Sequence, residues 1–200
     1  MEYSIKEVVG WTFAHSDVKA ATNNYLYLCN NYCGDYTKVA NSDFVLAVQK
    51  LAEIAEIGNP NVCRPMFVSA GQLFQKALKS LTDEEKLLSY LGEMFCNHWT
   101  GQDVLNMNLQ QEISTIEYHG TFWERHGYDI ISLGAIAVAA ASALCGAPPS
   151  TAAGCAGKGA RGLQDSHSDE FRASKRRFDK FRNDILSLKF YHHVVGRIYI

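Results

Sequence analysis

The chain has 200 residues, of which 47% are hydrophobic and 20% charged, so it is neither too short nor too polar to bury a core. Its net charge of −2 is unevenly placed: residues 1–157 carry 9 Lys and Arg against 16 Asp and Glu, giving −7, and residues 158–200 carry 10 against 5, giving +5. This asymmetry indicates an anionic partner for the basic end, such as lipid or nucleic acid, or else a solvated basic helix packed on an acidic body.

The first residues, MEYSIKEVVGWTF, have neither a basic start nor a long apolar core, so we expect synthesis in the cytosol. The six cysteines are then expected to be reduced thiols. Cys29 and Cys33 lie four residues apart on one face of a predicted helix, but no second pair completes a metal site. We therefore expect no metal and no cofactor.

Apolar residues at helical spacing dominate the first 128 residues. Residues 1–14 are expected to form a short helix or a cap on the core. Longer helices are predicted over 16–34, 41–58, 65–80, 82–97 and 100–123. Their start signals include Pro65 in a first turn and a capping box from Thr82 to Glu85. Only residues 191–200 resemble a strand, so the predicted fold class is all-α, a helical bundle.

Residues 130–157 carry no charged side chain. The 18 residues from 130 to 147 approach the roughly 20 that a membrane span needs, but nine of them are Ala or Gly, which favours close helix contact over a lone anchor. Pro148 and Pro149 end the predicted helix. The stretch predicts membrane entry or self-assembly; the alternative is a buried Ala-rich core helix with a Gly-rich loop. The predicted contact residues are Ile130, Leu133, Gly134, Ile136, Val138 and Leu144.

A last helix is predicted over about 165–190, with a narrow apolar stripe that includes Phe178, Phe181 and Ile185. Basic residues lie on the other faces, and we expect four of them to bind an anionic partner: Arg172, Lys175, Arg176 and Lys180. Such a helix either lies on anionic lipid or packs its stripe on its own bundle. The chain is thus divided into an acidic bundle (1–128), the apolar segment (129–157) and a basic helix and tail (158–200).

Arg161 and His167 suggest a different activity. An Arg fork stabilises phosphate charge and a His transfers protons at neutral pH, so the pair suits metal-independent RNA cleavage. The spacing resembles the signature of HEPN-type domains, helical bundles that pair to build an RNA-cleaving site. It differs in having five intervening residues and in Gly162 where a polar residue usually follows the Arg.

A small helical chain with a HEPN-like pair and a membrane-type segment is similar to the membrane accessory proteins found beside RNA-targeting type VI CRISPR effectors. The resemblance implies an oligomeric pore, associated with the inner (plasma) membrane, that strengthens anti-phage defence. Its partners would be copies of itself, membrane lipid, and RNA or the effector, with no small-molecule substrate. A HEPN-type ribonuclease using Arg161 and His167 is the alternative function, and a soluble helical scaffold or regulator is a third.

Overall fold

The computed structural model describes residues 4–120 and 169–188. Within these two ranges the chain forms helices and connecting turns, and no strand is present. The predicted all-α helical bundle is therefore confirmed. The strand-like residues 191–200 and the charge-free residues 130–157 lie outside the described ranges.

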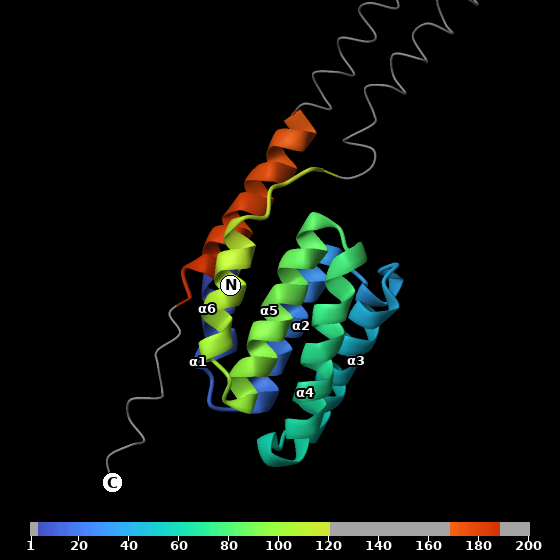
Figure 1. Cartoon of the computed structure of the whole chain (residues 1–200), viewed down its shortest axis with the longest axis vertical. Coiled ribbons are helices and arrows are strands. Elements are labelled where there is room, and N and C mark those ends of the chain that lie inside the picture. The colour runs from blue at the N-terminus through green and yellow to red at the C-terminus, as the bar shows by residue number, and fades with distance from the viewer. Residues whose placement is uncertain (1–3, 121–168, 189–200) are drawn as a thin grey trace, which may run out of the picture. The chain divides into compact units, whose positions relative to one another are not determined.

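Four helices form a closed ring: α2 (Val18–Cys33), α3 (Ser42–Ile57), α4 (Pro60–Ala77) and α5 (Asp83–Thr100). Each packs on the next, and α5 returns to contact α2 (Figure 1). The connections are short and include two 3-10 turns, η1 (Tyr36–Lys38) and η2 (Leu78–Ser80). Short connections between long helices are typical of an up-and-down bundle.

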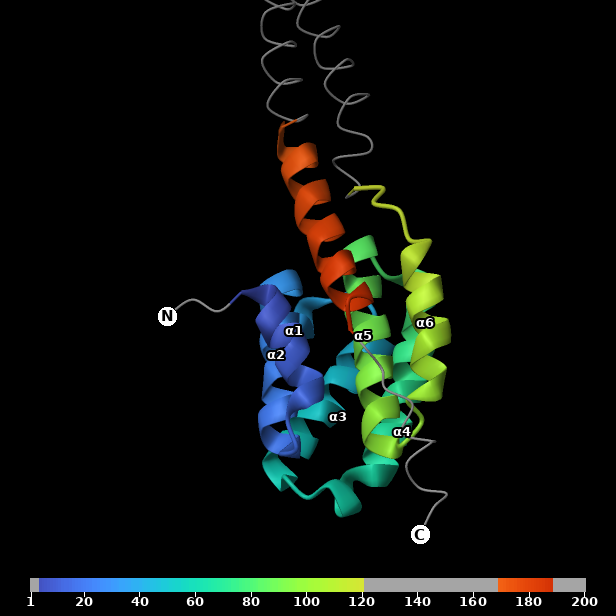
Figure 2. The same ribbon diagram turned by 90° about the vertical axis from the view of Figure 1, so that its left-hand side faces the viewer.

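Two shorter helices flank the ring. Helix α1 (Ile5–Ala14) packs on α2 and α5, and α6 (Val104–Ser114) packs on α5, so that α1 and α6 lie on opposite sides of α5 in Figure 2. A further helix covers residues 169–186. The chain divides into two compact units, one of Met1–Glu117 with Lys180–Ile200 and the other of Tyr118–Asp179.

The predicted helix starts are confirmed where a side chain caps the backbone. The side chains of Asp17 and Asn41 accept hydrogen bonds from Ala20 N and Phe44 N at 3.0 and 2.9 Å. Thr82 forms the predicted capping box, in which its hydroxyl accepts from Glu85 N and its own amide donates to the Glu85 carboxylate. These caps satisfy first-turn amides that have no partner inside the helix.

Helix α4 begins five residues earlier than the sequence analysis predicted. Asn59 is its N-cap, and Pro60 occupies the first turn where its missing N–H costs nothing. Pro65, predicted to lie in a first turn, is instead inside the helix. It is tolerated there because Pro65 and Asn61, whose carbonyl loses its donor, are both exposed and can be hydrated.

The predicted helix over residues 100–123 was also wrong at both ends. Helix α5 runs on to Thr100 and ends at Gly101, whose φ of 78° suits a residue without a Cβ. Helix α6 begins at Val104 and ends at Ser114. The hydroxyls of Ser114 and Thr115 donate to Gln111 O and Glu112 O at 2.6 and 2.7 Å, so they take carbonyls that a longer helix would use.

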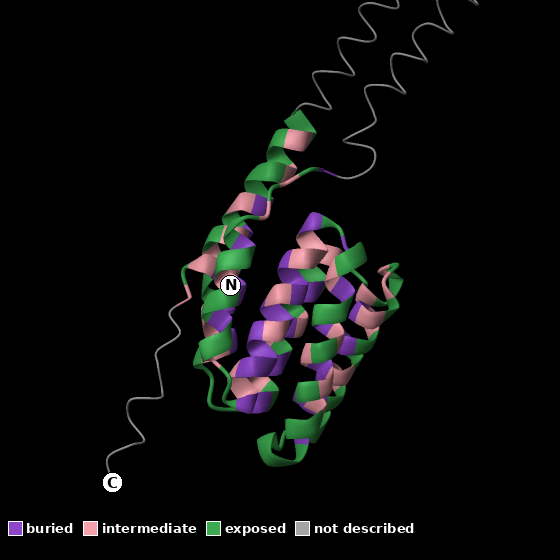
Figure 3. Ribbon diagram, in the orientation of Figure 1, coloured by how far each residue is buried: buried purple, intermediate pink, exposed green. Residues whose placement is uncertain are grey.

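Aromatic rings fill the centre of the ring of helices. Tyr25 stacks on Phe95 with centroids 5.9 Å apart and meets the edge of Phe74 at 5.8 Å. Phe44 and Phe67 extend the cluster with further edge contacts. These five side chains are fully buried, and the buried residues of the helices are purple in Figure 3. The apolar stripes predicted from the sequence thus converge on one core.

Candidate functional site

Only some of the predicted site residues lie within the described ranges. Arg161 and His167 lie outside the described residues, so their pairing stays a prediction. The same holds for the predicted membrane or oligomer residues, which are Ile130, Leu133, Gly134, Ile136, Val138 and Leu144. Among the described residues no helix is both long enough and apolar enough to cross a bilayer.

The four predicted anion-binding residues are described, and all of them are exposed on the helix of residues 169–186. Arg172 pairs with Asp169 at 3.3 Å and Lys175 with Asp179 at 3.0 Å, while Arg176 donates from Nε to the Arg172 carbonyl. Exposed pairs of this kind contribute little stability, so an anion could compete for these cations. Lys180 completes the predicted set.

The apolar stripe of this helix is buried, whereas its basic residues are not. Phe178, Phe181 and Ile185 have no exposed surface. Phe181 stacks on Tyr32 of α2 with ring centroids 4.0 Å apart. At Phe181 the stripe therefore packs on the protein's own bundle and does not face lipid.

Helix α6 holds the end of the same helix through main-chain carbonyls. Gln110 Nε2 donates to Leu188 O at 2.9 Å and to Ile185 O at 3.3 Å. Arg182 Nη1 donates in the other direction to Ile116 O at 2.6 Å. Carbonyls at a helix end lack partners within the helix, so these bonds satisfy groups at the ends of both α6 and the helix of residues 169–186.

In the second unit, Tyr118 packs on two aromatic rings, and residues 121–168 lie between Tyr118 and these rings in the chain. Its ring lies 5.6 Å from that of Phe171 and 5.3 Å from that of Phe178, measured between centroids. Tyr118 precedes the segment and both phenylalanines follow it in the chain. The chain therefore leaves the described structure and re-enters it at neighbouring points; we call the Tyr118, Phe171 and Phe178 cluster the aromatic clasp.

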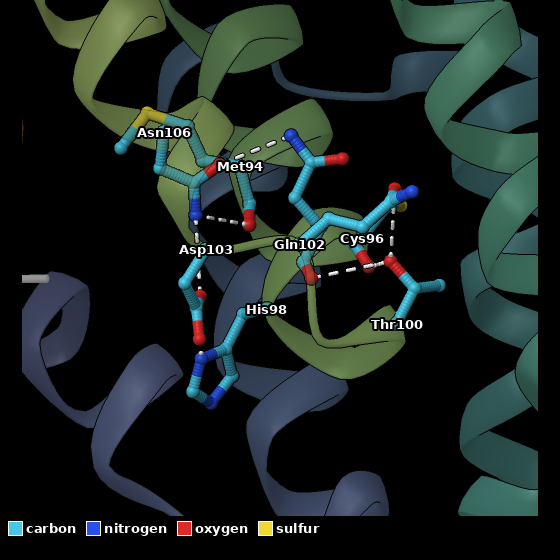
Figure 4. Close-up of polar contacts among 8 residues, drawn as sticks. Met94, Cys96, His98, Thr100, Gln102, Asp103 and Asn106 are labelled. Carbon is cyan, nitrogen blue, oxygen red and sulfur yellow. Dashed lines mark hydrogen bonds and ion pairs between the residues drawn. The ribbon is translucent and has the colours of Figure 1, made fainter. Parts of the chain in front are cut away.

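A polar network fixes the turn between α5 and α6 (Figure 4). The imidazole Nδ1 of His98 lies 3.0 Å from Asp103 Oδ1. Asn106, which is fully buried, donates from Nδ2 to Met94 O at 3.0 Å and accepts from Asn97 Nδ2 at 3.0 Å. Because a carboxylate only accepts, an ionised Asp103 requires the proton of neutral His98 to reside on Nδ1.

This network resembles half of a catalytic arrangement, since a carboxylate orients an imidazole. The nearby hydroxyl of Thr100, however, donates to main-chain carbonyls of Cys96 and Asn97 at 3.0 and 3.1 Å. These hydrogen bonds therefore favour a structural role in the turn over a role in proton transfer. The sequence analysis did not identify the pair; the signal available was a His and an Asp on either side of a helix-ending glycine.

Glu93 on α5 is a carboxyl group whose surroundings disfavour its charged form. Its Oε2 atom is buried without a hydrogen-bond partner. Burial, and then the negative charge of Glu112 on α6, raise the pKa of Glu93 to about 7. The hydroxyl of Tyr90 donates to Glu112 Oε2 at 3.1 Å. No sequence pattern marks Glu93, because a single Glu in a helix is usually a solvated residue.

The described residues contain no group of three or more His, Cys, Asp or Glu side chains that could hold a metal ion. Cys29 and Cys33 are instead tied to their own helix, since the Cys33 thiol donates to Cys29 O at 3.0 Å. Burial raises the pKa of Cys33 to about 11, which keeps this thiol protonated at neutral pH.

Comparisons with protein families, with curated proteins and with solved structures find no match for this chain. The fold of the described residues defines the class as an all-α helical bundle.

Proposed function

We propose that this chain is an oligomeric, membrane-associated protein that permeabilises membranes and acts as an accessory to another system. The finer fold assignment, a HEPN-like bundle with a membrane or oligomerisation segment, belongs to the same proposal. The resemblance resting on Arg161 and His167 adds anti-phage defence as the setting.

The observation that carries the proposal is the aromatic clasp around residues 121–168. Tyr118 contacts Phe171 and Phe178, so the charge-free stretch 130–157 is inserted between two neighbouring points of the fold. Both ends of such an insertion stay on one side of a membrane. This removes the need to export the acidic bundle, which a single span of residues 130–147 would require.

Composition supports assembly in addition to insertion. Half of residues 130–147 are Ala or Gly, and small residues let helices approach closely enough to pack within lipid. A lone copy of this segment gains little from entering a bilayer, whereas several copies packed together could line a passage. The proposal therefore requires both lipid and self-association.

Vesicles of phosphatidylethanolamine and phosphatidylglycerol, loaded with a self-quenching dye, test the proposal. The full chain should float with the vesicles and release the dye. Ile136→Asp should abolish release, because a charge at the centre of a membrane segment costs about 3 kcal/mol of insertion free energy. Val104→Asp is the matched control: Val104 is 56% exposed on α6, and its variant should release dye like the unmodified chain.

Failure of the unmodified chain to float or release dye would overturn the proposal, as would equal release by the Ile136→Asp variant. Light scattering on the same protein in detergent and without it measures the oligomer. A monomer in both conditions contradicts the pore. His167→Ala should leave dye release unchanged, because the proposed activity uses no proton transfer.

A further inference from the structure

The contact between α5 and α6 contains two carboxyl groups besides the pair of His98 and Asp103. Glu93 lies on α5 and Glu112 on α6, and neither forms an ion pair within the described residues. Glu112 is exposed and accepts the Tyr90 hydroxyl, whereas Glu93 Oε2 is buried without any donor. A buried carboxylate oxygen without a donor is costly, and the cost disappears when the group takes up a proton.

The ionisable groups that interact with Glu93 lie on α5 and α6. From α6 it faces Glu112, and on its own helix it is close enough to Tyr90 and Cys96 to raise the pKa of both. No described cation on α1, α2, α4 or residues 180–186 lowers the pKa of Glu93. No positive charge therefore offsets ionisation of Glu93.

Helix α6 is hydrogen-bonded to the end of the helix of residues 169–186. Gln110 lies two residues before Glu112 and donates to Ile185 O and Leu188 O. Asp184 is next to Ile185 in the chain. Its Oδ2 is buried without a partner, and burial raises its pKa although Lys180 and Lys6 lower it. In this part of the first unit, the folded state thus favours the protonated form of two carboxyl groups, Glu93 and Asp184.

We propose that Glu93 is a proton-operated latch: α6 packs firmly on α5 while the Glu93 carboxyl is protonated, and ionisation loosens α6 together with residues 185–188. The latch does not depend on membrane activity. An acid whose folded pKa is raised stabilises the packed form fully below its unfolded pKa. This stabilisation is lost as the pH rises through the folded value, which here is about 7.

Amide hydrogen exchange on the full chain at about pH 6 and about pH 8, corrected for intrinsic exchange rates, tests the latch. In the unmodified chain the opening equilibrium of α6 should rise by up to about tenfold between these conditions, as a shift of this size allows. Glu93→Gln, which stays uncharged, should remove most of that rise. Glu53→Gln, a substitution on the exposed face of α3, should keep it. An equal rise in the Glu93→Gln variant and the unmodified chain overturns the proposal.

Carbon NMR of the Glu carboxyl groups in the unmodified chain gives a second measurement that needs no stable Glu93 variant. A midpoint near 7 for Glu93 supports the latch, and Glu112→Gln should lower that midpoint because it removes the neighbouring negative charge. A Glu93 midpoint at the ordinary value near 4.5 overturns the proposal.

Discussion

The hydroxyl of Tyr25 on α2 donates a 2.8 Å hydrogen bond to the main-chain carbonyl of Leu88 on α5. The two residues are 63 positions apart in the chain. The bond is fully buried and joins the helices that close the ring, so it fixes how far α5 is rotated and slid against α2.

Tyr25→Phe should lower the free energy of unfolding by about 1 to 2 kcal/mol, because the ring still fills its place while the buried hydrogen bond is lost. Denaturant unfolding followed by circular dichroism measures the change. Tyr27→Phe is the matched control, since Tyr27 is 48% exposed on the same helix and its variant should change stability by less than about 0.5 kcal/mol. Equal effects of the two substitutions would show that the bond to Leu88 contributes nothing.

Gly92→Ala should destabilise the protein by about 3 kcal/mol, because overpacking a close-packed core is costly. A Cβ at this position would lie 2.5 Å from a ring carbon of Phe74 and 2.6 Å from the Tyr25 hydroxyl oxygen. Gly10→Ala should do the opposite. Nothing lies within 4 Å of a Cβ at Gly10 in α1, so Ala there should stabilise by about 0.5 to 1 kcal/mol. Changes of the same sign in the two variants would contradict the packing described for α5.

Asn106→Asp should destabilise the protein at neutral pH, because a carboxylate would replace the buried amide that donates to Met94 O. Burial should raise the pKa of the new carboxyl above its unfolded value, so the variant should recover stability as the pH falls and this group is protonated. Thermal unfolding across the acidic range measures the recovery. Asn108→Asp, exposed on the same helix, should be nearly neutral; a similar loss there would point to helix propensity as the cause.

Gln110→Ala should raise the rate of amide exchange over residues 180–188, because the side chain no longer donates to Ile185 O and Leu188 O. The expected loss is about 1 to 2 kcal/mol of local protection. Gln111→Ala, a neighbouring exposed position on α6, should leave the same region protected. If the two variants exchange alike, Gln110 does not hold the end of this helix.

Local chemistry made most helix boundaries predictable from the sequence. A cap such as Asp17, Asn41 or Thr82 acts within three residues of itself, so the pattern alone is sufficient. The errors arose where two local signals competed. Pro65 was predicted to start a helix that Asn59 and Pro60 already begin, and Gly101 ends the helix that the sequence analysis ended at Asn97.

The candidate site was less predictable, because its residues meet through tertiary packing. Neither the burial of Glu93 beside Glu112 nor the contact of Tyr118 with Phe171 has a sequence signature. His98 and Asp103 are only five positions apart, yet their pairing depends on how the turn after Gly101 folds back.

The sequence by itself determined the all-α class, the capped helix starts and the uneven charge, because these depend on side chains acting over one or two helical turns. Only the tertiary structure decided which helices close the ring, which carboxyl group is buried, and which residues flank the charge-free stretch in space. Burial and long-range contact are properties of packed helices together: the Gln110 bond to Leu188 spans 78 positions, far beyond the reach of any periodic pattern.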